Sequence, residues 1–187
     1  MPEQRPHPTP VTLVAPTTRR HAEWLEMVRE FAADGEEHVD GGAFFGLSVE
    51  DLAVPEAFDA WVRGALAHER GEDVPPAWVA STLRWVEQDG RLVGTIHLRH
   101  ELNDILREQG GHIGYGVRPS ARRRGVATAA LAAMRRLAAE RGMGRLLVTC
   151  DDDNAGSIGT IEANGGVLED VRGGLRRYWV PVVDPAR

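Results

Sequence analysis

The stretch "RRRGVATAALAAMRRLAAERG" (residues 122–142) contains three arginines, a glycine and then an alanine-rich run. Alanine has the highest intrinsic helix propensity of the twenty residues. An apolar stripe also recurs at the spacing of one helical face, at Ala127, Leu131, Met134 and Ala138. The sequence therefore predicts a long helix that begins close to Gly125 and ends at Gly142.

The start of this helix is a candidate anion site. A helix N-terminus leaves about four N–H groups unpaired and carries a partial positive charge. Gly125 has no side chain, Ala127 has a small one and Thr128 adds a hydroxyl, so a ligand can approach the backbone. Guanidinium groups of the preceding arginines would add charge-assisted hydrogen bonds to phosphate oxygens. A bound phosphate is the favoured interpretation; the alternative is a solvated charge run balanced by the acidic residues 151–153.

The flanking segments predict a mixed α/β fold. Strands are expected at 11–15, 78–88, 91–100, 111–118, 145–150, 165–171 and 175–183, with hairpin turns at Asp89-Gly90 and Gly173-Gly174. Helices are expected from residue 17 to Gly35, from Pro55 and from Asn154 to Ala163, with a short helical or irregular connection at 101–111. Residues 1–10 are proline-rich and polar and predict a disordered leader.

Composition excludes several function classes. The 187-residue chain has a formal net charge of −6, which argues against general nucleic-acid binding. It contains no lysine, which excludes a Walker A loop and lysine Schiff-base chemistry. Its single cysteine, Cys150, excludes an intramolecular disulfide, and its apolar neighbours favour a buried inert thiol over a nucleophile. No signal peptide or membrane-spanning run is apparent, so a cytoplasmic protein is expected.

Two stretches resemble motifs of the GNAT acyltransferases. "RPSARRRGVATAAL" (118–131) is similar to their cofactor loop, Arg/Gln-x-x-Gly-x-Gly/Ala, with matches at Arg122, Gly125 and Ala127. "DNAGSIGTIEANGG" (153–166) resembles the next motif, with Asn154 and Ser157 near a helix start. The runs "RHELND", "GGHIGY" and "IEANGGVLE" resemble a bacterial branch of predicted acetyltransferases, and the order of elements agrees from residue 11 to about residue 183.

This resemblance implies a single GNAT N-acetyltransferase domain over residues 11–187. Its fold would be a mixed, mostly antiparallel central sheet with helices on both faces and a splayed parallel pair of strands, 111–118 and 145–150. The diphosphate of acetyl-CoA would bind at the arginine turn, and the pantetheine arm would enter between the splayed strands. The implied cofactor-binding residues are Val117, Arg118, Arg122, Arg123, Arg124, Gly125, Val126, Ala127, Thr128, Asn154 and Ser157.

Glycines on the first splayed strand fit this arrangement independently. Glycines inside a strand often mark the close approach of another backbone, and Gly114 and Gly116 lie in the strand expected to pair with pantetheine. The alternative is that they only relieve crowding against a neighbouring strand. By the resemblance, the backbone N–H of Val117 would stabilise the oxyanion formed during acyl transfer.

The catalytic candidates are His112, His100 and Tyr115. Acyl transfer needs a neutral amine, and a histidine has a suitable pKa to act as base; the alternative for either histidine is a surface or capping role. Many GNAT enzymes carry a tyrosine on the later helix as acid, but the corresponding residue here is Ile161. Tyr115, Tyr178, Ser157 or a water would replace it, or the acidic CoA thiol would need no donor.

No metal is expected, because the histidines show no ligand pairing; the "DDD" run at 151–153 is interpreted as a solvated helix cap rather than a magnesium site. The expected acceptor is an unidentified amine of a small molecule or peptide, reached by direct transfer in a ternary complex. Its pocket is assigned to residues 35–80 and 100–112, with candidate walls at Phe44, Phe45, Trp61, Trp78 and Trp85. No nucleic-acid or membrane partner is expected, and the protein would be a monomer or a homodimer.

Two other functions remain open at this point. The missing tyrosine leaves room for a non-catalytic acyl-CoA-binding or sensing domain. A nucleotide or dinucleotide binder is disfavoured, because "GYGVRP" and "RGMGR" lack the full G-x-G-x-x-G spacing.

Overall fold

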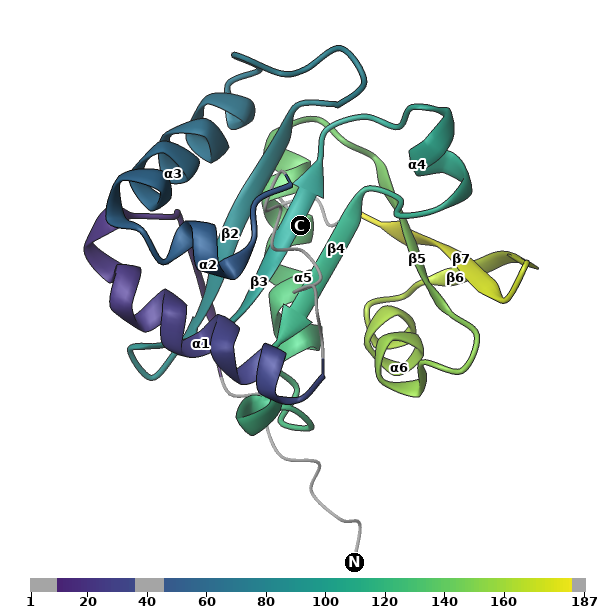
Figure 1. Cartoon of the computed structure of the whole chain (residues 1–187). Helices are drawn as coiled ribbons and strands as arrows, with labels where there is room; N and C mark the ends of the chain where they lie inside the picture. The colour runs from purple at the N-terminus through teal and green to yellow at the C-terminus, as the bar shows by residue number, and fades with distance from the viewer. Residues whose placement is uncertain (1–9, 36–45, 183–187) are drawn as a thin grey trace, which may run out of the picture.

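The computed structural model describes residues 10–35 and 46–182. Their seven strands form one sheet in the order β1-β2-β3-β4-β5-β7-β6 (Figure 1). The strands are β1 (Thr12–Val14), β2 (Ser81–Gln88), β3 (Arg91–Arg99), β4 (Ile113–Val117), β5 (Arg145–Asp151), β6 (Val167–Arg172) and β7 (Leu175–Pro181). All neighbouring strands are antiparallel except β4 and β5, which are parallel. The mixed, mostly antiparallel sheet expected from the sequence is confirmed.

Helices cover both faces of this sheet. They are α1 (His21–Ala33), α2 (Val49–Leu52), α3 (Pro55–Glu69), α4 (Asp104–Glu108), α5 (Val126–Glu140) and α6 (Ala155–Ala163), with 3-10 turns η1 (Thr18–Arg20) and η2 (Pro119–Ala121). Figure 1 shows α1, α2 and α3 on the near face and α5 on the far face. Helix α6 packs beside α5 and against β5.

Alternation along the strands divides the core into two clusters. On β2, Leu83 and Trp85 face α1–α3, while Val86 faces α5. The α1–α3 side is dominated by aromatic side chains, and the rings of Trp61 and Trp85 are 6.5 Å apart between centroids. These two tryptophans are 4 % and 0 % exposed, so they are core residues and not walls of an acceptor pocket.

The other acceptor-pocket candidates lie elsewhere. Trp78 is 48 % exposed on the connection before β2. Phe44 and Phe45 lie outside the described residues, as does the leader at residues 1–9.

The feature that positions the site is the separation of β4 from β5. These strands pair only at Ile113 and Val148, although either strand continues beyond that point. Figure 1 shows them diverging away from α4. The splayed parallel pair implied by the resemblance is therefore present.

Candidate functional site

The turn that joins β4 to α5 leaves a helix N-terminus without a side-chain cap. Arg123 has φ +61°, and Gly125, the N-cap residue, has φ +78°, a left-handed conformation that glycine adopts without strain. No side chain caps the first turn of α5, and that turn contains no acidic residue. The N–H groups of this turn are therefore available to an anion.

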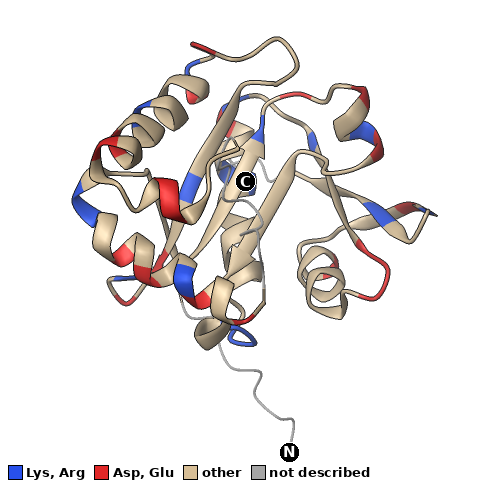
Figure 2. Ribbon diagram, in the orientation of Figure 1, with Lys and Arg blue, Asp and Glu red and all other residues tan. Residues whose placement is uncertain are grey.

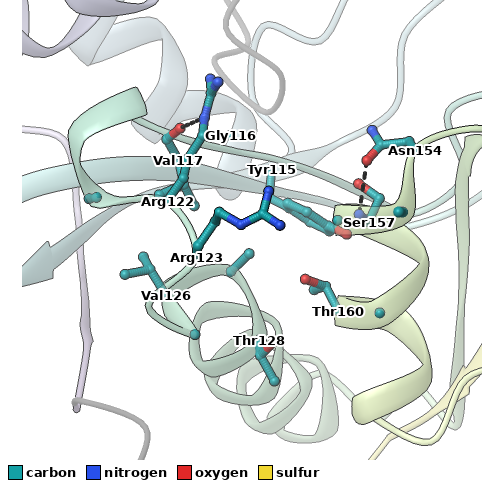
Figure 3. A pocket seen from close by; sticks show the side chains of 16 residues that line it. Tyr115, Gly116, Val117, Arg122, Arg123, Val126, Thr128, Asn154, Ser157 and Thr160 are labelled. Atoms are coloured by element: carbon teal, nitrogen blue, oxygen red, sulfur yellow. Dashed lines mark hydrogen bonds between the residues drawn. The ribbon is translucent and has the colours of Figure 1, made fainter.

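A cavity of about 660 Å³ opens directly in front of this turn (Figure 3). Its walls come from the C-terminal half of β4, the arginine turn and the start of α6. Its volume lies in the range usual for small-molecule sites. The predicted site residues that line it are Tyr115, Val117, Arg122, Arg123, Gly125, Val126, Ala127, Thr128, Asn154 and Ser157.

Gly116, expected from the sequence to approach pantetheine, also lines the cavity. The rest of the wall was not assigned by the sequence analysis and is formed by Ala121, Ala155, Gly156, Gly159 and Thr160. On α6, residues 156, 159 and 160 share one helical face through their i, i+3 and i+4 spacing. That spacing, together with two glycines on one face, was the signal that could have identified them.

The arginines of the turn point in different directions. Figure 3 shows the Arg123 side chain directed into the cavity, and it forms no hydrogen bond or ion pair with the described residues. Arg122 turns away: its Nε donates to the Val117 carbonyl at 2.9 Å, and its Nη1 donates to Asp34 at 2.7 Å. Arg124 is exposed and does not line the cavity. Figure 2 shows these positive residues as a short loop near one end of α1.

Arg118, a predicted cofactor ligand, is not brought to the cavity. Arg118 is 6 % exposed, and its guanidinium donates to Glu30 from Nε at 2.6 Å, to Glu26 from Nη2 at 3.0 Å and to the Leu92 carbonyl from Nη1 at 3.2 Å. Glu30 also accepts the Ser120 backbone N–H at 2.6 Å. Although burial opposes it, these hydrogen bonds from Ser120 and Arg118 lower the pKa of Glu30. The charge of Arg118 is thus satisfied by two carboxylates, and these contacts hold the start of the arginine turn against α1.

Backbone groups of β4 complete the site. Arg99 donates its N–H to the His112 carbonyl, and Arg118 donates to the Val93 carbonyl. Antiparallel pairing alternates, so residues 114 and 116 bond to β3 while Tyr115 and Val117 direct their backbone groups toward β5. Because β5 has separated there, no strand pairs with this edge of β4 within the described residues.

A family comparison agrees with this arrangement. The model described as "Acetyltransferase (GNAT) family" matches residues 47–165, more than half of the chain. The chain belongs to the GNAT acetyltransferase family. A comparison with curated protein sequences gave no match.

Solved structures with the same fold include several GNAT proteins. The microcin C7 self-immunity acetyltransferase MccE, in complex with acetyl-CoA and AMP, is 14 % identical over 94 % of this chain and 98 % of its own, with a TM-score of 0.64. RimL, a ribosomal L7/L12 alpha-N-protein acetyltransferase in complex with CoA, is 18 % identical over 93 % and 95 %, with a TM-score of 0.65. Mycobacterium smegmatis RimJ, in complex with CoA-disulfide, is 20 % identical over 96 % and 84 %, with a TM-score of 0.66.

His112, the first candidate for a base in this GNAT chain, does not line the cavity. Its side chain is 8 % exposed, and its Nδ1 accepts the backbone N–H of Leu147 at 2.8 Å. Burial, followed by the charges of Arg107 and Arg99, lowers the pKa of His112 to about 4. The ring is therefore neutral with its proton on Nε2, so neither nitrogen has a lone pair free to accept a proton from an amine.

His100 also lies away from the cavity. Its Nε2 is 2.9 Å from the Thr82 hydroxyl, and it is not among the cavity-lining residues. Burial, followed by the charge of Arg141, lowers the pKa of His100 to about 4. The structure thus brings neither predicted histidine to the cavity.

Of the hydroxyl candidates, Tyr115 and Ser157 face the cavity. Figure 3 shows the Tyr115 ring reaching from β4 toward Ser157 at the start of α6. Asn154 caps that helix by accepting the Ser157 N–H at 2.9 Å. Tyr178 is buried elsewhere and donates to Glu162 at 3.2 Å, and Ile161 is a fully buried core residue.

The remaining chemistry-bearing groups add no second site. Burial raises the pKa of the Cys150 thiol, which fits the inert interpretation. Among residues 10–35 and 46–182, no group of three or more histidine, cysteine, aspartate or glutamate residues could hold a metal ion. Within the same ranges, no helix has the length and apolar character needed to cross a bilayer.

Proposed function

We propose that this GNAT chain transfers an acetyl group from acetyl-CoA to an amine of a small molecule or peptide, by direct transfer in a ternary complex. One observation carries the proposal. A single cavity joins the uncapped first turn of α5 to the edge of β4 from which β5 has separated. A ligand with a diphosphate at one end and an amide-bearing arm at the other fits both parts.

The diphosphate end is assigned to the arginine turn. Backbone N–H groups at the start of α5 would donate to the phosphate oxygens, where the helix dipole favours negative charge. The Arg123 guanidinium, directed into the cavity, would add a charge-assisted hydrogen bond. Gly125 and Ala127 would leave the backbone open to contact.

The arm is assigned to β4. Its amides would pair with the backbone of Tyr115, as an added peptide strand pairs with a sheet edge. The Val117 carbonyl accepts Arg122 Nε, so at Val117 the ligand would use the N–H. The thioester supplies an activated acetyl group, and the Val117 N–H would polarise its carbonyl oxygen as the amine nitrogen forms the new C–N bond. As the C–S bond breaks, the sulfur takes a proton from the Tyr115 hydroxyl or from water, and the amine releases its proton to water.

Turnover is tested by thiol release from acetyl-CoA with an amine panel. The panel includes peptides with free N-terminal amines as well as small amines, because RimL is named an alpha-N-protein acetyltransferase and MccE a self-immunity acetyltransferase. Thiol release with one member supports the proposal. Tight CoA binding without turnover across the panel would instead favour a non-catalytic sensor, which the isoleucine at position 161 keeps as the second candidate.

Cofactor placement is tested by Gly125→Glu, which puts a carboxylate at the uncapped helix start. We expect CoA binding to fall by about 100-fold or more, because a carboxylate beside the diphosphate is a like-charge contact, which costs several kcal/mol. Gly142→Glu is the matched control: Gly142 has a similar φ of +74° at the other end of α5, with open space around it. CoA affinities are measured by calorimetry. If they are equal for the two variants, the assignment of the diphosphate to this turn is wrong.

A further inference from the structure

The closed end of the β4–β5 pair is held by a compact set of contacts, which we call the strand clamp (residues 110–112 and 147–149). The Gly110 N–H donates to the Thr149 hydroxyl at 3.1 Å. The His112 N–H donates to the Leu147 carbonyl at 2.7 Å, and the Leu147 N–H donates back to His112 Nδ1 at 2.8 Å. The strands also pair at Ile113 and Val148 and then separate.

The imidazole of His112 replaces a backbone acceptor in this clamp. In a parallel pair, each N–H that points toward the neighbouring strand normally donates to a carbonyl of that strand. Here the carbonyls of Gly110 and Gly111 instead accept hydrogen bonds from Arg99 Nη1, at 2.8 and 3.1 Å. The Leu147 N–H is buried and needs an acceptor, which only the His112 side chain supplies among the described residues.

Two further residues fix the position of the imidazole. Gly111 has φ +56°, and a Cβ there would lie 2.4 Å from the Leu147 carbonyl oxygen, so only glycine lets the strands approach this closely. The Trp179 ring lies 6.3 Å from the imidazole, centroid to centroid, on the strand whose register places Trp179 opposite Leu147. The His112 imidazole thus lies between β4, β5 and β7.

We propose that His112 is a positioning residue that closes one end of the β4–β5 gap and so sets where Tyr115 and Val117 present their backbone groups. This inference rests on the proposed function, because the gap matters only if an arm of CoA enters it. The clamp lies about 16 Å along the strand from Val117, at roughly 3.3 Å per residue. If the clamp is loosened, the part of β4 that carries Tyr115 and Val117 would therefore move, while the arginine turn would stay in place.

The test separates the two ends of the ligand. CoA probes both the turn and the gap, whereas adenosine 3′-phosphate 5′-diphosphate carries the nucleotide and diphosphate without the pantetheine arm. For His112→Ala we expect CoA affinity to fall about tenfold, the equivalent of one hydrogen bond lost between the displaced β4 edge and pantetheine, while nucleotide affinity stays within about twofold. The KM for acetyl-CoA should rise in the same proportion.

Conservative variants show whether the acceptor atom is what matters. The Asn Oδ1 of His112→Asn can occupy the place of Nδ1, whereas the Gln amide of His112→Gln reaches the place of Nε2. We expect His112→Asn to restore CoA affinity to within about threefold and His112→Gln to resemble His112→Ala. This pair also keeps the test usable if His112→Ala does not fold.

Glu23→Ala is the matched control, because Glu23 Oε1 accepts the Leu92 N–H of β3 at 2.7 Å and does not line the cavity. It should lower thermal stability without changing the ratio of CoA to nucleotide affinity.

An unchanged ratio of CoA to nucleotide affinity in both His112→Ala and His112→Gln would overturn the inference. So would a His112→Asn variant that binds CoA normally yet loses turnover, since that result identifies a proton carrier. If the unaltered chain binds the nucleotide but shows no added affinity for CoA, the proposed function itself fails.

Discussion

At its N-terminal end β4 is bound to β5 through the strand clamp, whereas at its C-terminal end Tyr115 and Val117 face a gap that β5 has left. The backbone of β4 is therefore paired differently at its two ends. At the clamp, a side chain is added so that a buried N–H is satisfied; at the gap, β5 no longer pairs with this edge of β4, and the Val117 carbonyl accepts Arg122 Nε. In the function proposed above, the pantetheine arm would take the place of β5 along this edge of β4.

The largest effect is expected at the open end, from Val117→Pro. Proline removes the N–H that faces the gap but leaves the β3 ladder intact, because residues 114 and 116 make that ladder. Loss of one oxyanion donor predicts a fall in kcat of about 100-fold or more, with a smaller change in the Kd for CoA. Gly116→Pro is the contrast, since it removes a ladder hydrogen bond and should lower Tm instead. Equal kcat for Val117→Pro and the unaltered chain would exclude this N–H from catalysis.

A smaller effect is expected from Arg123→Ala. A hydrogen bond to a charged group contributes about 1.5–3 kcal/mol, so CoA affinity should fall about 30-fold and its salt dependence should weaken. Arg124→Ala should change affinity by less than about twofold, because this residue is exposed and does not line the cavity. Titration calorimetry at two salt concentrations measures both effects, and equal losses for the two arginines would contradict the assignment.

The smallest effect concerns the closed end and pH. The pKa of His112 is about 4 in the folded protein against an ordinary value of 6.5, so the unfolded chain binds this proton more readily between those values. Stability from the neutral ring is complete above pH 6.5 and is lost as pH falls toward 4. His112→Asn should flatten the dependence of unfolding free energy on pH by up to about one proton in that window.

His97 and His100 have pKa values lowered to about 3 and about 4, so the variant should retain part of the slope. Denaturant titrations across this window measure it. A slope identical to that of the unaltered chain would show that His112 is not held neutral by the clamp.

The sequence was informative wherever one short segment determined the structure. Helix α5, the hairpins at 89–90 and 173–174, and the helix starting at Pro55 follow from local propensity and turn chemistry. The arginine turn was also predictable, since its glycine and the following alanine-rich run lie within a few residues.

Long-range partners explain what the sequence could not show. Arg118 looked like a phosphate ligand beside Arg122, but its buried charge is satisfied by Glu26 and Glu30, about 90 residues earlier in the chain. His112 looked like a base because histidines often are, yet its acceptor role depends on the Leu147 N–H across the sheet. Neither partner leaves a local signal, since the contact exists only once the strands and α1 have packed.

A crystal structure of the chain with bound CoA tests the central claim most directly. The account predicts the diphosphate within hydrogen-bond distance of the backbone N–H groups that open α5, the pantetheine amides paired with the backbone of Tyr115, and the thiol end of the arm close to the Val117 N–H. A ligand bound elsewhere, with the arginine turn and the β4–β5 gap empty, would contradict it.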